Sequence, residues 1–207
     1  MHSPTRRLLH VHIPKCAGTA IEASLREYGV DDLGAVEHQK HWSAAAWRGA
    51  LGREVFDAAF KFAVVRHPGD LLVSSFHYHR DVNPPPSPHW IPPHLRFDQW
   101  VREHVVPLPR GMCRELDGLA WWVTERVGDG ALDVKWLVDA VIRYDSLAEG
   151  WRGVIAPRAG LDPERCPLLH RNGSPHGDWR GYFQEGGLRA AVEERYAEDF
   201  ALFGWEW

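Results

Sequence analysis

The sequence lacks the features that mark membrane, secreted and disulfide-stabilised proteins. Its first apolar run begins at Leu8, is interrupted by His10 and His12, and ends at Pro14, which is too short for the core of a signal peptide or for a membrane span. No later run reaches membrane-spanning length. The chain has only three cysteines, far apart, so a disulfide framework is not expected. We therefore expect a cytoplasmic protein.

There is also no excess of positive charge and no familiar metal motif. Lysines and arginines number 24 against 28 acidic residues, which gives a net charge of −4. A protein that coats nucleic acid is usually basic, so no nucleic-acid partner is expected. The 13 histidines form no HExxH pattern, and no cysteine pair has zinc-ligand spacing. We expect no metal.

What the sequence does contain is the pattern of a single α/β domain over residues 1–207. Apolar segments predict strands at Leu8–Ile13, Phe60–Val65 and Leu137–Arg143. Helices are predicted at Gly18–Tyr28, Ser43–Leu51, Pro68–His79, Phe97–His104, Cys113–Arg126, Leu147–Gly160 and Gly186–Phe203. This alternation predicts three layers, with a central parallel sheet flanked by helices. Ligands of such sheets bind beyond the carboxyl ends of the strands. The proline-rich residues 83–94 predict a stiff surface loop.

The segment between the first strand and the first helix has the composition of an anion-binding loop. Residues 12–21 read HIPKCAGTAI. Small residues from Cys16 to Ala20 let the backbone wrap an anion, and the amides at a helix start favour negative charge. Lys15 adds a positive charge, and the Thr19 hydroxyl adds a donor. The lysine stands before the glycine, so this is not a Walker loop, in which lysine follows the last glycine.

A second anion-binding junction follows the next strand. Arg66 stands at the end of that strand, and Ser74 lies about two turns into the following helix. An arginine and a hydroxyl together can grip a phosphate. Taken alone, Arg66 would fit a structural salt bridge, for example to Asp70, better than a phosphate site. Two such junctions on successive parallel strands point to a ligand with two separate anionic groups.

Together these segments resemble the sulfotransferases that use 3′-phosphoadenosine 5′-phosphosulfate (PAPS). The first loop is similar to the H-[IV]-P-K-[TC]-[GA]-G-T-[ST] loop of one branch, and residues 66–74 are similar to the family's R-[ND]-P-x-[DE]-R-x-V-S motif. Residues 172–174, 179–183 and 194–200 resemble the branch's closing patterns N-x-S, Y-R-x-Y-[YF] and E-R-Y-x-x-D-F. The resemblance spans almost the whole chain and implies a P-loop-like fold.

The resemblance also implies a cofactor and its binding residues. PAPS would be the sulfuryl donor, adenosine 3′,5′-bisphosphate the product, and no metal would be required. The residues implied for the 5′-phosphosulfate are Lys15, Cys16, Ala17, Gly18, Thr19 and Ala20. Arg66 and Ser74 would hold the 3′-phosphate, and Arg171 and Ser174 would close over the nucleotide. Lys15 would in addition stabilise the leaving phosphate oxygen.

Four positions depart from the family's patterns. Ala17 stands where glycine is usual, which should be tolerated if the backbone there is right-handed, and Ala20 replaces a hydroxyl residue. Both changes are expected to weaken cofactor binding without abolishing it. His67 replaces Asn or Asp, and Leu71 replaces a frequent arginine. Neither of these two positions is expected to grip the phosphate.

A histidine between the two motifs is the candidate general base, because its pKa lies near neutrality. Members of the branch often read K-H-[AT]-[TS]-A before a helix at this point, and Lys40-His41 followed by Ser43-Ala44 is similar. His41 is therefore the preferred base, with His38 as the alternative. The non-catalytic alternative is that His41 is a surface or helix-capping residue.

The acceptor is expected to be a hydroxyl or amine of a sugar or of another small molecule. The resembling branch acts largely on carbohydrates, which is an analogy at the level of the family. Four tryptophans lie in segments that could border an acceptor site: Trp42, Trp47, Trp90 and Trp100. Two other functions remain open. One is a small-molecule kinase with a phosphate loop, and the other is a nucleotide-binding module without catalysis.

Overall fold

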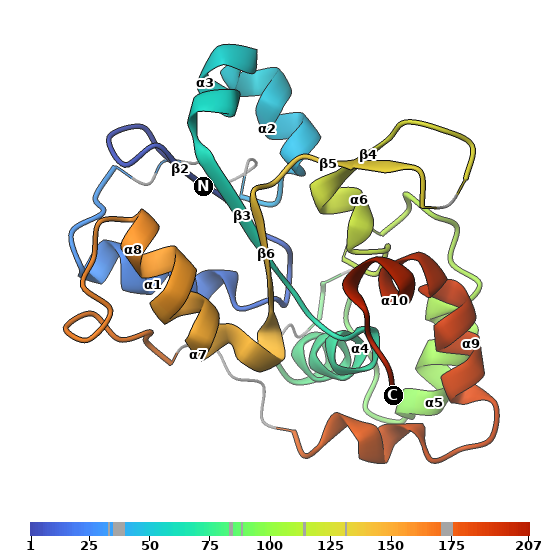
Figure 1. Ribbon diagram of the computed structural model, residues 1–207. Helices are drawn as coiled ribbons and strands as arrows, with labels where there is room; N and C mark the ends of the chain where they lie inside the picture. The colour runs from blue at the N-terminus through green and yellow to red at the C-terminus, as the bar shows by residue number, and fades with distance from the viewer. Residues whose placement is uncertain are drawn as a thin grey trace. The chain divides into compact units, whose positions relative to one another are not determined.

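The chain forms two compact units. The structure is a computed structural model (Figure 1). The residues that it describes are 1–32, 34, 40–82, 85–87, 89–113, 115–130, 132–170 and 176–207. The first unit comprises Met1–Arg66 and Leu119–Asn172, and the second comprises His67–Gly118 and Gly173–Trp207. The assignment of residues 1–207 to one sulfotransferase domain stays a prediction.

A four-stranded mixed sheet lies at the centre of the first unit (Figure 1). Its strands, in spatial order, are β1 (His2–Ser3), β2 (Leu8–Val11), β3 (Phe60–Val65) and β6 (Ala140–Arg143). The neighbours β2 and β3 are parallel, as are β3 and β6, while β1 is antiparallel to β2. The α/β class and the three parallel strands are confirmed, and β1 is an addition that the sequence did not predict.

All four residues of β2 are buried, as are the five residues of β3 that follow the partly buried Phe60, as expected for strands covered on both faces. Lys61 is the charged residue of β3. Its ammonium group is buried but donates to the carbonyl oxygen of Ala59 at 2.7 Å and lies 3.0 Å from the Asp139 carboxylate. A buried charge with such partners is compatible with the core of the unit.

The helices of the first unit follow the predicted alternation closely. They are α1 (Gly18–Glu27), α2 (Ala44–Leu51), α3 (Arg53–Ala58), α6 (Ala120–Val123), the turn η4 (Tyr144–Ser146), and α7 (Leu147–Gly150), which continues through the π-helical η5 (Trp151–Ile155) into α8 (Ala156–Arg158). Ser43 caps α2, because its hydroxyl accepts a hydrogen bond from the amide of Ala46. α3 is a further helix that the sequence did not predict.

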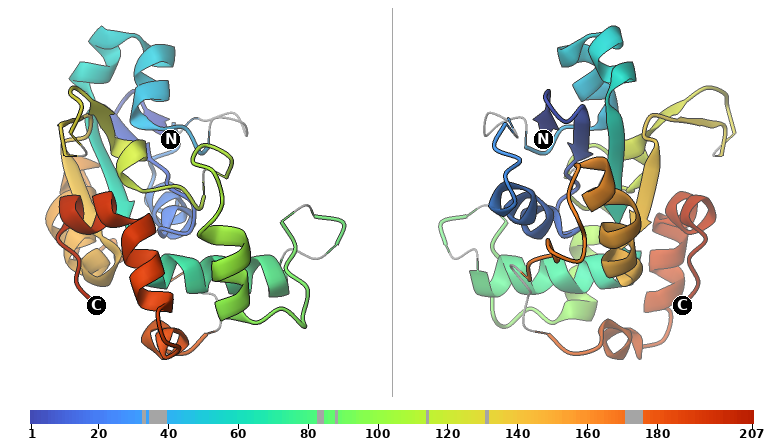
Figure 2. Two further views of the ribbon diagram at one scale, coloured as in Figure 1. Left: turned by 90° about the vertical axis from the view of Figure 1, so that its right-hand side faces the viewer. Right: turned by 60° about the vertical axis from the view of Figure 1, so that its left-hand side comes forward.

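The helix predicted over Cys113–Arg126 is wrong for most of its length. Among the described residues of this range, only α6 is helical. The next residues form β4 (Thr124–Arg126), which pairs antiparallel with β5 (Val134–Trp136). Asp117 explains part of the error, since its carboxylate accepts the amide of Gly111 and supports a turn instead of a helix. Figure 2 shows the β4–β5 hairpin projecting beyond the sheet of its unit.

The second unit is helical in the part of the chain that the structure describes. Its elements are α4 (Pro68–His77) with the π-helical η2 (Tyr78–Val82), α5 (Phe97–Trp100) with η3 (Val101–Val105), the short helical turn η6 (Trp179–Phe183), α9 (Leu188–Arg195) and α10 (Ala197–Phe203). The predicted helix at 186–203 is therefore interrupted at Tyr196. Apolar side chains from α4, α5, η3, η6 and α9 form one core. Among the described residues, no helix of either unit has the length and apolarity needed to cross a membrane.

Tyr196 ties the α9–α10 junction to a turn in the core of the second unit. Its hydroxyl, which is buried, donates to the carbonyl oxygen of Leu116 at 2.8 Å. We expect Tyr196→Phe to lower the free energy of unfolding by about 1–3 kcal/mol, because it leaves that buried carbonyl without a donor. Urea denaturation measures the change.

Tyr28→Phe is the matched control. The Tyr28 hydroxyl makes the same kind of bond, to the carbonyl oxygen of Pro167 at 2.9 Å, but at an exposed position where water can replace it. We expect this control to lose less than about 1 kcal/mol. Equal losses in the two variants would contradict the assignment of a buried, water-excluded bond to Tyr196.

Candidate functional site

The loop between β2 and α1 folds as a tight curve with two left-handed residues. Lys15 and Ala17 both have φ near 61°, a conformation that is strained for any residue except glycine. The condition under which alanine was expected to be tolerated at position 17, a right-handed backbone, is therefore not met. Ala17 also stands directly before α1 and carries no acceptor, so its side chain does not cap the first amides of the helix. Those amides are the groups that an anion would meet.

The side chains of this loop divide between the surface and the core. Lys15, Ala17 and Thr19 are partly exposed, whereas Cys16 and Ala20 are buried. Of the residues predicted to bind phosphosulfate, Cys16 and Ala20 can thus offer their backbone only. The hydroxyl missing at Ala20 would have pointed into the core, so its replacement by alanine removes little from the exposed side of the loop.

Gly18 is required by a neighbouring side chain. A Cβ atom built at this position would overlap the imidazole ring of His12. The glycine of the motif therefore serves close packing between the end of β2 and the first turn of α1.

Arg66 brings the second predicted junction into contact with the first. Its guanidinium is buried, with 7% of the residue exposed, and Nη1 donates to the carbonyl oxygen of Lys15 at 3.0 Å. The guanidinium carbon also lies 4.2 Å from the centre of the Tyr144 ring, a cation–π contact. Because Tyr144 follows β6, Arg66 links the segments that leave all three parallel strands.

The remaining phosphate-binding predictions are not settled by this geometry. Ser74, the predicted partner of Arg66, is buried on α4 in the second unit, and its pairing with Arg66 stays a prediction. Arg171 and Ser174 lie outside the described residues, as does His38, the alternative base.

His41 lies beside the anion loop and is held in one tautomer. Its ring is exposed, and its Nδ1 lies 3.1 Å from the carbonyl oxygen of His12. A carbonyl oxygen can only accept, so Nδ1 donates and a neutral His41 carries its lone pair on Nε2. The His41 ring also meets the His12 ring edge-on, with centres 4.7 Å apart. His41 thus has the proton arrangement that a general base requires.

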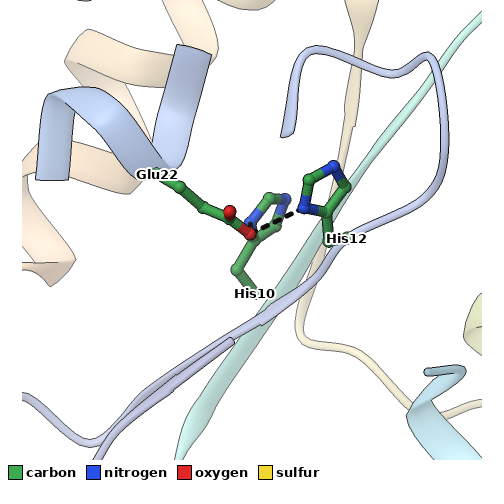
Figure 3. Close-up of side chains that lie close together, drawn as sticks. All are labelled: His10, His12 and Glu22. Atoms are coloured by element: carbon green, nitrogen blue, oxygen red, sulfur yellow. Dashed lines mark hydrogen bonds and ion pairs between the residues drawn. The ribbon is translucent and has the colours of Figure 1, made fainter. Parts of the chain in front are cut away.

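Figure 3 shows a buried group that the sequence did not predict: His10, His12 and Glu22. Oε1 of Glu22 accepts a hydrogen bond from Nδ1 of His12 at 2.7 Å and lies 3.5 Å from Nδ1 of His10. Alternate residues of a strand share a face, so the pairing of His10 with His12 was readable in the sequence. The approach of Glu22 from α1 was not, because no spacing rule links it to the strand.

The protonation of this group follows from its burial. Burial lowers the pKa of both imidazoles, to about 4 for His12, although the Glu22 carboxylate opposes the shift. Burial would raise the pKa of Glu22, but the two imidazoles outweigh it and hold that pKa below its usual range. At neutral pH the carboxylate is therefore ionised and both histidines are neutral.

These three side chains are also of the types that bind zinc. A tetrahedral zinc ion with bonds of about 2.1 Å separates its ligand atoms by about 3.4 Å. The 2.7 Å between His12 and Glu22 is shorter than that separation and fits a shared proton. The geometry thus favours a hydrogen-bonded pair.

Two of the four tryptophans proposed to border an acceptor are core residues. Trp47 and Trp100 are buried, each within its own unit. Trp42, which follows His41 directly, is partly exposed and packs edge-on against Trp47, with ring centres 5.5 Å apart. Trp90 is partly exposed in the second unit. Trp42 is therefore the tryptophan that adjoins the candidate base.

Comparisons of the chain with protein-family models, with curated proteins and with solved structures find no match.

The strain at Ala17 gives a direct test of the loop conformation. We expect Ala17→Gly to stabilise the protein by about 1 kcal/mol, because relief of a left-handed alanine exceeds the added freedom of glycine in the unfolded chain. Ala23→Gly, in the right-handed middle of α1, should instead cost about 1 kcal/mol. Thermal or urea unfolding compares the two variants, and destabilisation by both would contradict the left-handed loop.

Proposed function

We propose that this protein is a PAPS-dependent sulfotransferase with a P-loop-like fold. It would transfer a sulfuryl group to a hydroxyl or amine of a sugar or of another small acceptor. The observation that carries the proposal is the 3.0 Å hydrogen bond from Arg66 to the carbonyl oxygen of Lys15. It joins the two motifs that the resemblance assigns to the two anionic ends of the donor.

The two motifs lie on neighbouring parallel strands. Val11, the last residue of β2, pairs with Ala63, and β3 ends two residues later at Val65. Both loops therefore leave the same edge of the sheet, where ligands of α/β proteins bind. A donor with a 5′-phosphosulfate and a 3′-phosphate needs two cationic groups at such an edge, and Lys15 and Arg66 supply them.

The chemistry requires an in-line displacement. The bond between sulfur and the 5′-phosphate oxygen breaks as a bond from sulfur to the acceptor oxygen or nitrogen forms. Lys15 and the first amides of α1 would stabilise the charge that develops on the leaving phosphate oxygen. Nε2 of His41 would take the proton from the acceptor, since its Nδ1 already donates to His12.

Binding of adenosine 3′,5′-bisphosphate tests the donor site. By isothermal titration calorimetry we expect micromolar affinity for the wild type and at least tenfold weaker binding for Arg66→Ala and Lys15→Ala. The loss of one hydrogen bond or ion pair to a charged group, about 1.5–3 kcal/mol, corresponds to at least that factor. Thermal unfolding verifies that each variant is folded.

Arg48→Ala is the control, because Arg48 makes a partly exposed ion pair with Glu125 elsewhere in the first unit. It should bind the bisphosphate as the wild type does. A wild type that binds ATP with magnesium and not the bisphosphate would refute the proposal and favour a kinase. Bisphosphate binding without sulfuryl transfer to any acceptor would favour a non-catalytic nucleotide-binding module.

The role of His41 is tested by its removal. We expect His41→Ala to lower kcat for transfer of ³⁵S-sulfuryl from PAPS by about 10²–10⁴-fold, the usual contribution of a general base. Affinity for the bisphosphate should change less than threefold, since the imidazole acts on the acceptor. His104→Ala, an exposed histidine of the second unit, is the control. A kcat for His41→Ala equal to that of the control would exclude His41 as the base.

A further inference from the structure

Glu22 places a carboxylate in the interior of the first unit, on the second turn of the helix that the anion loop enters. Its residue is 7% exposed, and its Oε1 faces His10 and His12 (Figure 3). Well-packed apolar side chains usually stabilise a core at least as well as a buried charge does. Stability therefore does not explain why a carboxylate lies in this core. The side chains that the carboxylate holds in place suggest another explanation.

The carboxylate fixes one state of the His12 ring. An ionised carboxylate can only accept hydrogen bonds, so Nδ1 of His12 carries the proton and Nε2 carries the lone pair. The bond also fixes the orientation of the ring. A buried carboxylate on Nδ1 orients the imidazole of catalytic triads and of many metal-bound histidines in the same way.

The oriented His12 residue touches two parts of the proposed transfer site. Its ring fills the space beside Gly18, where α1 begins and where its first amides face the loop. The same ring meets the ring of His41, and the backbone carbonyl of His12 accepts from Nδ1 of His41. A single residue thus connects the anion loop with the candidate base.

We infer that Glu22 is a positioning residue of the transfer site, acting through His12. The carboxylate holds the His12 ring, and the ring sets the first turn of α1 and the place of His41. Glu22 itself is buried away from the donor and the acceptor. The inference rests on the proposed function for its kinetic consequence, while the positioning itself is independent of turnover.

Imidazole ¹⁵N spectra and steady-state kinetics of Glu22→Gln test the inference together. In the wild type at neutral pH, His12 should show a single neutral tautomer with the proton on Nδ1. In Glu22→Gln we expect a mixture of tautomers, shifted His41 resonances and a kcat at least tenfold lower. The KM for PAPS should change by less than threefold, because Lys15 and Arg66 remain.

Glu125→Gln is the matched control, since it makes the same chemical change at the partly exposed ion pair with Arg48. This control should leave the ¹⁵N resonances of His12 and His41 unchanged and kcat within twofold of the wild-type value. A wild-type His12 without a single Nδ1-protonated tautomer overturns the inference, whether or not Glu22→Gln folds. The inference is also overturned if Glu22→Gln folds and has either the wild-type kcat or unchanged His41 resonances. If the wild type does not use PAPS, the proposed function fails, and the His41 resonances of Glu22→Gln alone decide the positioning role.

Discussion

The parallel pairing of β2 with β3 is the constraint on which the candidate site depends. Its register, from Leu8 with Phe60 to Val11 with Ala63, brings the two strand ends to one edge of the sheet. The segments that leave this edge carry Lys15 and Arg66, which are 51 positions apart in the chain and joined by a hydrogen bond. A register shifted by one residue would turn the side chains of β2 to the other face and remove His10 and His12 from Glu22.

The site combines two features that cost free energy, backbone strain and buried charge. Two residues other than glycine adopt left-handed conformations within three positions, and a carboxylate and a guanidinium are buried nearby. Each feature has a partner that makes it tolerable: Glu22 bonds His12, and Arg66 bonds a carbonyl and stacks on Tyr144. Strain and buried charge of this kind persist where the surroundings determine the conformation, and they gather at functional sites. The loop therefore has a fixed shape of its own, which is the condition for preorganised charge stabilisation in the proposed reaction.

The sequence predicts those parts of the fold that depend on local pattern. Continuous apolar runs identified Phe60–Val65 with its observed bounds, and Ser43 marked the start of α2 correctly. The helix over Cys113–Arg126 failed because β4 exists only through its pairing with β5, and a short strand has little local signature. The first bound of β6 was placed too early for a related reason, since its partner β3 determines where pairing begins.

The same distinction between local pattern and tertiary packing applies to the residues of the candidate site. The loop, Arg66 and His41 were recognisable because each belongs to a contiguous motif. The conformation of Ala17 was not, because handedness is imposed by the chain entering α1 and leaves no mark on the residue type. Glu22 was missed because it looks like an ordinary acidic residue on a helix, and only the packing of α1 against β2 turns it inward.

The packing of α1 against β2 gives His12 and His41 different environments. The two rings are in contact, yet one is buried with a pKa of about 4 and the other is exposed. A base must change its protonation during turnover, whereas a residue that holds it must not. Burial suits His12 to the second role, because it stays neutral across the range in which an exposed imidazole titrates. In the proposed mechanism, the buried histidine would keep its hydrogen bonds while His41 gains and loses a proton, so the geometry of the loop would not change with the protonation of the base.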